Sequence, residues 1–249
     1  SQKDCPNYLG YFTDDRYALL VKEEGSHLIR TPAYSEENNV YHQENYITLQ
    51  ADGNATAKSI TTMSGGRQGY LRNIKHQVSS KEKEKSLNNF FNIASFTIDQ
   101  YTITNKDNAP FQAQLDSELS IRKFASKAGK RFILSPALEE YKKEVPGVLE
   151  HRQYDIINHR AYTNIERSTI VLPPNFIVEN IAKDPVEVNT PFGIFTTTTE
   201  VTEDQKIIFT RTLKMHKFSF PPDQYEAYRQ FLKSINENAN PKVMIAEKK

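Results

Sequence analysis

The segment "FQAQLDSELSIRKFA" (residues 111–125) decides the fold class, because its hydrophobic residues recur with a period of two. One face of an extended chain would carry Phe111, Ala113, Leu115, Ser117, Leu119 and Ile121, and the other Gln112, Gln114, Asp116, Glu118 and Arg122. An alternation of this length is typical of a β-strand with one face in the core and one in solvent.

Two other segments predict pairs of strands. "NYITLQADGNATAKSITTM" (45–63) predicts a hairpin around Asp52-Gly53, a dipeptide that favours the positive φ angles of a tight turn. "ERSTIVLPPNFIVENI" (166–181) predicts two strands around a corner at Pro173-Pro174-Asn175.

The C-terminal third continues this pattern. The threonine-rich "IFTTTTEVTEDQKIIFTRTLKM" (194–215) predicts a hairpin that turns between Thr202 and Gln205. "KVMIA" (242–246) predicts a last strand.

Helical signals are confined to two segments. Ser79 and Glu82 form a candidate capping box, and the apolar residues that follow it are Leu87, Phe90, Phe91 and Ala94. Pro221-Pro222 precedes a second set at helical spacing, formed by Tyr225, Tyr228, Leu232 and Ile235. We therefore predict a mainly β chain with antiparallel β-sandwich architecture and two packed α-helices.

Two shorter motifs have structural interpretations. "SGGRQG" (64–69) is glycine-rich but lacks the Lys-Ser or Lys-Thr step of a phosphate loop, so we interpret it as a flexible strand-to-strand connection. "KEKEK" (81–85) alternates in charge on the first predicted helix, which indicates a solvated helix face.

Two polar stretches are candidate boundaries. "YSEENN" (34–39) follows Thr31-Pro32, where a strand is expected to end. A weaker break is expected at "EEYKKEVPG" (139–147), either between two strand-rich halves or as a long loop within one sandwich.

Composition excludes several classes of protein. The 249 residues are 37% apolar and 25% charged, which fits a globular chain long enough to bury a core. The net charge of +1 provides no global field for attracting nucleic acid or acidic lipid. The basic residues are not interleaved with aromatic residues, so we expect no nucleic-acid partner.

The single cysteine, Cys5, excludes an intramolecular disulfide and a cysteine-based zinc site. No apolar run approaches the length of a membrane span. No basic segment followed by an apolar stretch opens the chain, so we expect no signal peptide in it. This pattern fits a cytoplasmic protein, and equally a chain from which an upstream part was removed.

Cys5, His27 and Asp14-Asp15 are the residue types of a thiol nucleophile with its base. Nucleophilic thiol chemistry needs a thiolate of lowered pKa, typically at a helix N-terminus beside an imidazole. Cys5 is followed by Pro6 and Asn7 and by no amphipathic helix. We interpret it as a free thiol near a chain end.

The remaining histidines and the paired acids give no clear site. None of His42, His76, His151, His159 and His216 forms the i, i+4 pair of a helical metal site, and we interpret them as solvated or edge residues. Neighbouring acids on a strand point to opposite faces. We therefore interpret the acid pairs as solvated loop residues rather than catalytic carboxylates: Asp14-Asp15, Glu23-Glu24, Glu36-Glu37 and Glu139-Glu140. No catalytic, cofactor-binding or metal-binding residue is predicted.

Near its start the chain carries "NYLGYFTDDRYALLVKEEGSHLIRTP" (7–32). This segment resembles the one that directly follows the core of bacterial transglutaminase-like proteins. The matching points, in order, are Tyr8-Leu9-Gly10, Phe12-Thr13-Asp14-Asp15-Arg16, Ala18-Leu19-Leu20 and Thr31-Pro32.

Residues 152–235 resemble the β-domain of unknown function that ends these proteins. The recognisable points are Leu172-Pro173, Pro191-Phe192-Gly193, and Pro221-Pro222 with Tyr225, Tyr228 and Phe231. The resemblance spans nearly the whole chain and is weaker between residues 60 and 140.

The resemblance implies a domain organisation. Residues 1–36 would be the tail of the transglutaminase-like core or a connector, and residues 37–249 a β-sandwich region, with 37–145 and 146–249 as its halves. The family's catalytic Cys, His and Asp belong to the preceding core and align with no residue here, so this chain would be no enzyme and need no cofactor. Its parent would be exported, to the periplasm or the cell surface.

The expected function is therefore that of a non-catalytic C-terminal accessory region. It would flank the core of the same protein and contribute to substrate access or to contacts with a partner. An alternative is an independent glycan- or peptide-binding module with exposed tyrosines, for which Tyr154, Tyr162, Tyr225 and Tyr228 are available. A third hypothesis is a hydrolase with an unrecognised pair of acids.

Overall fold

The computed structural model describes residues 12–76, 79–108, 111–181 and 185–248. In this part of the chain 47% of the residues lie in strands and 17% in helices, which confirms the predicted mainly β class.

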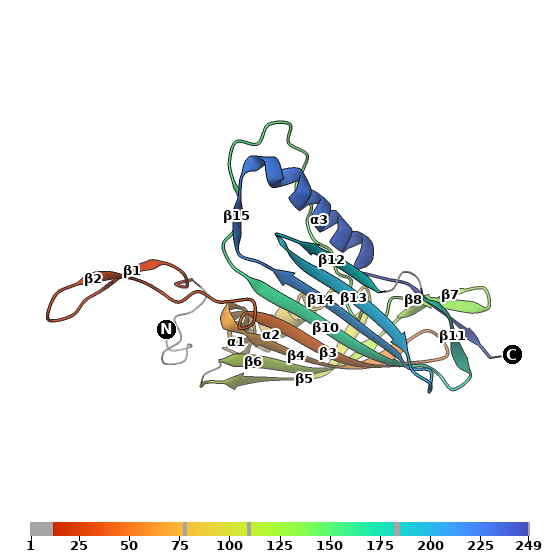
Figure 1. The fold of residues 1–249 in the computed structure, drawn as a ribbon. Coiled ribbons are helices and arrows are strands. Elements are labelled where there is room, and N and C mark those ends of the chain that lie inside the picture. Colours follow the sequence, from red (N-terminus) through yellow and green to blue (C-terminus); the bar gives the residue numbers. More distant parts are fainter. Residues whose placement is uncertain (1–11, 77–78, 109–110, 182–184, 249) are drawn as a thin grey trace.

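The largest element is a twisted eight-stranded sheet (Figure 1). Its strands are β3 (Val40–Leu49), β4 (Ala55–Ser64), β5 (Phe96–Lys106), β6 (Gln112–Ile121), β10 (Tyr162–Val171), β12 (Val186–Thr190), β13 (Gly193–Val201) and β14 (Ile207–Met215). They lie in the order β12-β13-β14-β10-β3-β4-β6-β5. Neighbours in this sheet are antiparallel except β3 and β10, which run parallel.

Smaller sheets and three helices accompany it. A four-stranded sheet, in the order β11-β16-β8-β7, contains β7 (Ala125–Ala128), β8 (Arg131–Leu134), β11 (Phe176–Ile181) and β16 (Val243–Glu247). Two-stranded sheets are formed by β1 (Tyr17–Leu20) with β2 (His27–Arg30), and by β9 (Ile156–Asn158) with β15 (Phe218–Phe220). The helices are α1 (Gln68–His76), α2 (Ser80–Asn88) and α3 (Tyr225–Asn238), with 3-10 turns at Gly65–Arg67 and Pro222–Gln224.

One face of the eight-stranded sheet is buried, and two hydrophobic clusters cover it. The larger cluster joins β3, β4 and β6 to α1, α2 and the four-stranded sheet, through residues such as Leu115, Leu71, Leu87 and Ile245. Side chains from the two sheets thus share one core, as in a sandwich. The alternation predicted for residues 111–121 is confirmed, because Ala113, Leu115, Ser117, Leu119 and Ile121 are buried.

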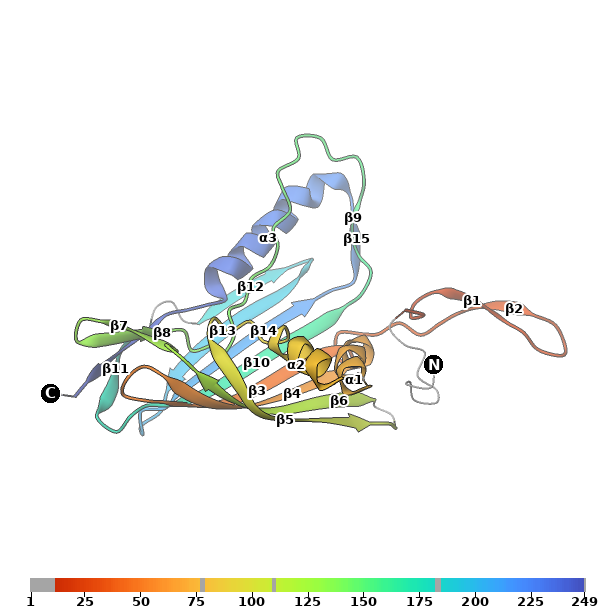
Figure 2. The ribbon, with the colours of Figure 1, turned by 180° about the vertical axis from the view of Figure 1, so that it is seen from behind.

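The second cluster places α3 over the β12–β14 end of the sheet (Figure 2). Phe231, Leu232 and Ile235 of α3 pack with Phe195 and Leu213 of the sheet, and all five are at most 3% exposed. Burying each of these side chains contributes about 1.5–3 kcal/mol, so α3 is held by packing more than by helix propensity.

The β1-β2 hairpin projects away from the body in both views (Figures 1 and 2). It is joined to β3 through a tight turn at 35–39, in which the backbone amide of Ser35 donates to Asn38 Oδ1 and that of Asn39 to Ser35 O. The buried side chain of Asn39 then donates to Ala161 O, which fixes the turn to the body.

Several local predictions are confirmed. The β3-β4 hairpin turns around Asp52-Gly53, with Gly53 at φ +90°, and the β13-β14 hairpin turns between Thr202 and Gln205. Ser79 and Glu82 form the predicted capping box of α2. This helix ends at Asn88, so Phe90 and Phe91 follow it instead of extending its apolar stripe.

The interpretation of "SGGRQG" as a flexible connection is wrong. Gly65–Arg67 is a 3-10 turn that leads directly into α1, a helix that no sequence pattern predicted. Gly65 has φ +59°, and a Cβ there would lie 2.6 Å from Asn38 O, so the glycine is required by the backbone and by close packing.

The eight-stranded sheet takes strands from both sides of residue 145. The parallel β3-β10 pairing, from Thr163 opposite Val40 to Val171 opposite Thr48, forms the middle of the sheet.

Candidate functional site

A band of polar side chains crosses the buried face of the eight-stranded sheet. The strand register places Gln43 beside Glu166, and Glu166 beside Arg211. Two residues further along β3 and β10, the register places Ser59 beside Asn45, and Asn45 beside Ser168. Each of these side chains is at most 6% exposed, so water cannot supply their hydrogen bonds from bulk.

Glu166 and Arg211 form an ion pair in the centre of this band. The second carboxylate oxygen of Glu166 accepts hydrogen bonds from the backbone amide of Leu138 at 2.7 Å and from Ser168 Oγ at 3.3 Å. The Arg211 guanidinium also donates to Ala239 O at 2.8 Å and lies 4.5 Å from the centre of the Tyr141 ring. Both charges are therefore saturated by protein groups.

A cavity of about 220 Å³ lies beside this pair. Its lining residues are Tyr41, Gln43, Arg67, Phe90, Glu139, Glu140, Tyr141, Asn164, Ile165, Glu166, Arg211 and Leu213. Aromatic rings form much of its wall, and carboxylates, amides and guanidinium groups form the polar part.

Glu139 is the unusual carboxylate of this cavity. Its partners are neutral: Gln43 Nε2 donates to Oε1 at 2.7 Å, and the backbone amide of Asn92 donates to Oε2 at 3.2 Å. Desolvation raises the pKa of Glu139 to about 7, and the nearby negative charge of Glu166 acts in the same direction. Burial also raises the pKa of Tyr41 well above its ordinary value.

The segment 141–147 follows Glu139 and Glu140 and is bound to α3 and the residues that follow it. Asn240 accepts from the backbone amide of Tyr141 and donates to its carbonyl, and Asn236 makes the same pair of bonds with Lys143. Arg229 Nε donates to Pro146 O at 2.8 Å. The polar stretch that looked like a weak break is thus firmly attached to the C-terminal helix.

A second cluster of charges holds the base of the β1-β2 hairpin. Asp14 is 4% exposed and forms a bidentate pair with Arg160, with contacts of 2.7 and 2.9 Å. Asp15 pairs with Lys217 and with Arg30, and these two partners lower its pKa. The contacts with Arg160 and Lys217 connect residues 14 and 15 to segments more than 140 residues away.

The acid pairs behave differently from the prediction of solvated loop residues. That interpretation is wrong for Asp14, which is buried against Arg160, and for Glu139, which lines the cavity. It holds for Glu23 and Glu24, which are exposed. Sequence proximity was a poor guide here, because the partners come from distant segments.

The residues of the thiol hypothesis are not brought together by any described contact. Cys5 lies outside the described residues, His27 is exposed, and Asp14 is engaged by Arg160. Among the other histidines, His151 and His159 are exposed, whereas His216 is half-buried with Nδ1 2.9 Å from Glu36 Oε2. His216 is therefore part of the attachment of residues 35–39 rather than a solvated edge residue.

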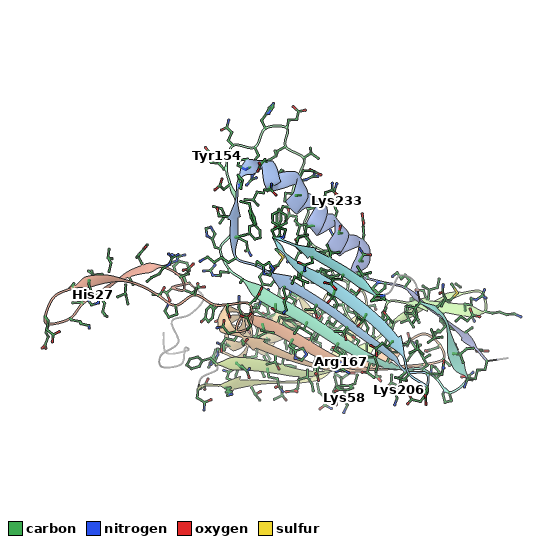
Figure 3. The ribbon with its side chains drawn as sticks, viewed as in Figure 1. His27, Lys58, Tyr154, Arg167, Lys206 and Lys233 are labelled. Carbon is green, nitrogen blue, oxygen red and sulfur yellow. The ribbon has the colours of Figure 1, made fainter. Side chains whose placement is uncertain are left out.

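The four tyrosines of the binding-module hypothesis do not form one platform. Tyr154 is 79% exposed and lies at the outer end of the molecule (Figure 3), whereas Tyr225, the first residue of α3, is 7% exposed and packs in the second hydrophobic cluster. Tyr162 and Tyr228 are half-buried, and Arg67 lies 4.5 Å from the centre of the Tyr162 ring.

Local sequence patterns did not predict the cavity or its central ion pair. One available signal was Arg211, which stands between Phe209 and Leu213 on the buried face of a period-two strand. A charged residue at such a position indicates a buried partner.

The chemical capacity of this region follows from its donors and acceptors. Glu166 and Arg211 are occupied by each other, so the polar groups of the lining that can meet a ligand include Glu139, Glu140, Asn164 and the tyrosine hydroxyls. Within the described ranges no group of three His, Cys, Asp or Glu side chains is arranged to hold a metal ion. None of the helices in the described ranges has the length and hydropathy of a membrane span.

Residues 130–245 match the family model described as a Domain of Unknown Function with solved-structure structure (DUF3858). The predicted resemblance of the C-terminal part to a domain of unknown function is thereby confirmed. The matched range contains Glu139, Glu166 and Arg211, whereas Tyr41 and Gln43 of the same cavity lie outside it. No curated protein and no solved structure matches the chain.

Proposed function

We propose that this chain is a non-catalytic accessory region of a transglutaminase-like exported bacterial protein, located in the periplasm or at the cell surface. It flanks the catalytic core of the same protein and contributes to substrate access or partner contacts. The observation that carries the proposal is the β1-β2 hairpin, which has no hydrophobic core of its own.

Large apolar side chains are exposed along this hairpin. Tyr17, Leu19, Val21 and Leu28 are 61–73% exposed. An isolated two-stranded hairpin is marginally stable in water, and a continuous exposed apolar surface marks a site of interaction. The resemblance of residues 7–32 to the segment after a transglutaminase-like core suggests that core as the surface that covers the hairpin.

The base of the hairpin is suited to hold a neighbouring domain in a defined orientation. Asp14 and Asp15 are connected by ion pairs to Arg160 and Lys217 of the body. Thr31 Oγ1 donates to Thr13 O at 2.6 Å and accepts from the amide of Arg16, which ties the two ends of the hairpin together. The charges of "FTDDR" thus have a structural role in this proposal.

The polar cavity offers little to support hydrolysis by a pair of acids. Such chemistry needs one carboxylate as acid and another that is free to act as base or nucleophile. Glu139 has the raised pKa of an acid, but Glu166 is bound by Arg211, Leu138 and Ser168. This occupation supports the non-catalytic role.

The test is association with the upstream core of the same protein, expressed separately and titrated with this chain in a calorimeter. We expect saturable binding that is lost in the triple variant Tyr17→Ser, Leu19→Ser, Leu28→Ser. The control is Tyr46→Ser, because Tyr46 is 53% exposed on the outer face of the eight-stranded sheet. Equal binding by the triple variant, or no binding by the native chain, would contradict the proposal.

The purified chain is also expected to show no peptidase or acyl-transfer turnover. Turnover that disappeared in Glu139→Gln, with folding unchanged, would instead establish the acid-pair hydrolase.

The alternative function is an independent glycan- or peptide-binding module. The exposure of Tyr154 favours it, but Tyr225 is unavailable because it is buried. A glycan and peptide array separates the two functions: specific binding that Tyr154→Ala abolishes would favour the module.

A further inference from the structure

The cavity beside Glu139 is a site of its own, and it does not depend on the accessory function proposed above. Its volume of about 220 Å³ is below the range of about 300–1,000 Å³ for drug-sized ligands, so it suits one side chain or a small molecule. An oligosaccharide would not fit within it.

The charges around the cavity favour a cation. Its lining carries three carboxylates, Glu139, Glu140 and Glu166, and two guanidinium groups, Arg67 and Arg211, of which Arg211 is paired with Glu166. Glu139 is the carboxylate whose described hydrogen-bond partners, Gln43 and the amide of Asn92, carry no charge. Its remaining lone pairs are available to a donor.

The neutral polar groups point to the same ligand chemistry. Asn164 Oδ1 is a buried acceptor without a hydrogen-bond partner in the described part of the chain. Its amide nitrogen lies 3.5 Å from the hydroxyl of Tyr141, at the edge of hydrogen-bond distance. A buried acceptor of this kind is costly unless a donor reaches it.

The aromatic walls are also suited to a cation. Tyr41, Phe90 and Tyr141 line the cavity together with Glu139. Ring faces attract ammonium groups, and the attraction strengthens where water is excluded. The alkyl chain of an amine would meet the apolar part of the same wall.

We propose that this cavity binds the primary ammonium group of a small amine or of a lysine-type side chain. Glu139 and Asn164 accept its N–H groups, and Tyr41, Phe90 and Tyr141 enclose its alkyl chain.

Binding of an ammonium group beside Glu139 should depend on pH. The charged and polar side chains around Glu139 come from the sheet, from the turn before α1 and from the segment of Glu139 itself. They are Tyr41, Gln43, Glu166, Arg211, Arg67, Glu140 and Tyr141. Since the pKa of Glu139 is raised to about 7, an arriving ammonium displaces a proton from it. Binding should therefore weaken about tenfold from about pH 8 to about pH 6.

The experiment titrates the purified chain with n-butylammonium chloride and follows the amide signals of Tyr141 and Asn164 by NMR. We expect saturable shifts with a dissociation constant in the millimolar range, and no comparable shifts with sodium butyrate. Shifts that stay linear in concentration, or equal saturation by butyrate, would overturn the proposal.

Variants locate the site. Glu139→Gln should weaken n-butylammonium binding at least about tenfold and remove its pH dependence. Asn164→Leu should weaken binding several-fold, and Glu118→Gln, on the exposed outer face of the same sheet, should leave it unchanged. If Glu139→Gln does not fold, the test is the pH dependence of binding by the unsubstituted chain. Equal binding of n-butylammonium at about pH 6 and about pH 8 would contradict the proposal.

Discussion

Glu166 and Arg211 are paired across neighbouring strands, in the centre of the buried sheet face, with side chains only 5% and 6% exposed. The pair connects the two hydrophobic clusters. Glu166 also binds the amide of Leu138, a residue of the larger cluster, and Arg211 binds the carbonyl of Ala239, a residue of the second cluster. Loss of the pair should therefore lower the free energy of unfolding of the whole fold.

Arg211→Met is predicted to lower the free energy of unfolding by about 3–5 kcal/mol, because it leaves the Glu166 carboxylate buried and unpaired. The double variant Glu166→Leu, Arg211→Met should lose less than the sum of the single variants. Urea unfolding of all four proteins measures this coupling. The exposed pair Lys58–Glu118, joined at 3.1 Å, is the control and should contribute about 0–1 kcal/mol. If the effects of the Glu166 and Arg211 substitutions on the free energy of unfolding were strictly additive, the coupling between the two residues would be contradicted.

Glu139 is predicted to make the native state less stable as pH rises. Its pKa is raised from 4.5 to about 7, so the native state binds this proton more tightly than the unfolded state does. The resulting cost grows from about pH 4.5 upward and is complete above about pH 7, where it reaches about 3 kcal/mol. Glu139→Gln removes that cost. The free energy of unfolding of this variant, relative to that of the unsubstituted chain, should therefore increase with pH. Urea midpoints between about pH 4 and pH 8 test this, with Glu118→Gln on the outer face of the sheet as the control for loss of a carboxylate.

Gly65→Ala is predicted to destabilise the protein by about 1–3 kcal/mol, because a Cβ at φ +59° would lie 2.6 Å from Asn38 O. Gly69 is the matched control, since it lies in α1 and a Cβ there meets nothing within 4 Å. Gly69→Ala should be neutral or stabilising by up to about 1 kcal/mol. Thermal unfolding compares the two, and equal effects would show that the turn tolerates a side chain.

Arg160→Ala is predicted to loosen the attachment of the β1-β2 hairpin, because it leaves the buried Asp14 without its bidentate partner. Amide hydrogen exchange should become faster in residues 12–31 and stay unchanged in β10 and β14. Arg152→Ala is the control, since Arg152 binds the carbonyls of Tyr154 and Asp155 in a neighbouring loop. Faster exchange throughout the sheet would indicate a general loss of stability instead.

Local elements were predictable because their causes are local. The hairpin at Asp52-Gly53 follows from turn chemistry, and the start of α2 follows from the reciprocal bonds of Ser79 and Glu82. The strand at residues 112–121 follows from a period-two pattern that only an extended chain can bury on one side. The antiparallel, mainly β class followed from these elements together.

The elements that were not predicted depend on contacts between distant segments. The glycines of "SGGRQG" suggested a flexible connection, yet Gly65 packs against Asn38 and begins the turn into α1. The parallel β3-β10 pairing joins residues more than 120 positions apart, which no local pattern encodes.

The sequence alone thus determined the inward face of the strand at residues 112–121, the hairpins at Asp52-Gly53 and Thr202–Gln205, and two of the helices, since hydrophobic periodicity, turn chemistry and capping act within a few residues. Tertiary structure alone decided which polar residues meet. It paired Asp14 with Arg160 and Glu166 with Arg211, and it half-buried Glu139 among the groups that raise its pKa. The physical reason is that the ionisation and partners of a side chain depend on its surroundings in space, and the register of a sheet brings these together from remote parts of the chain.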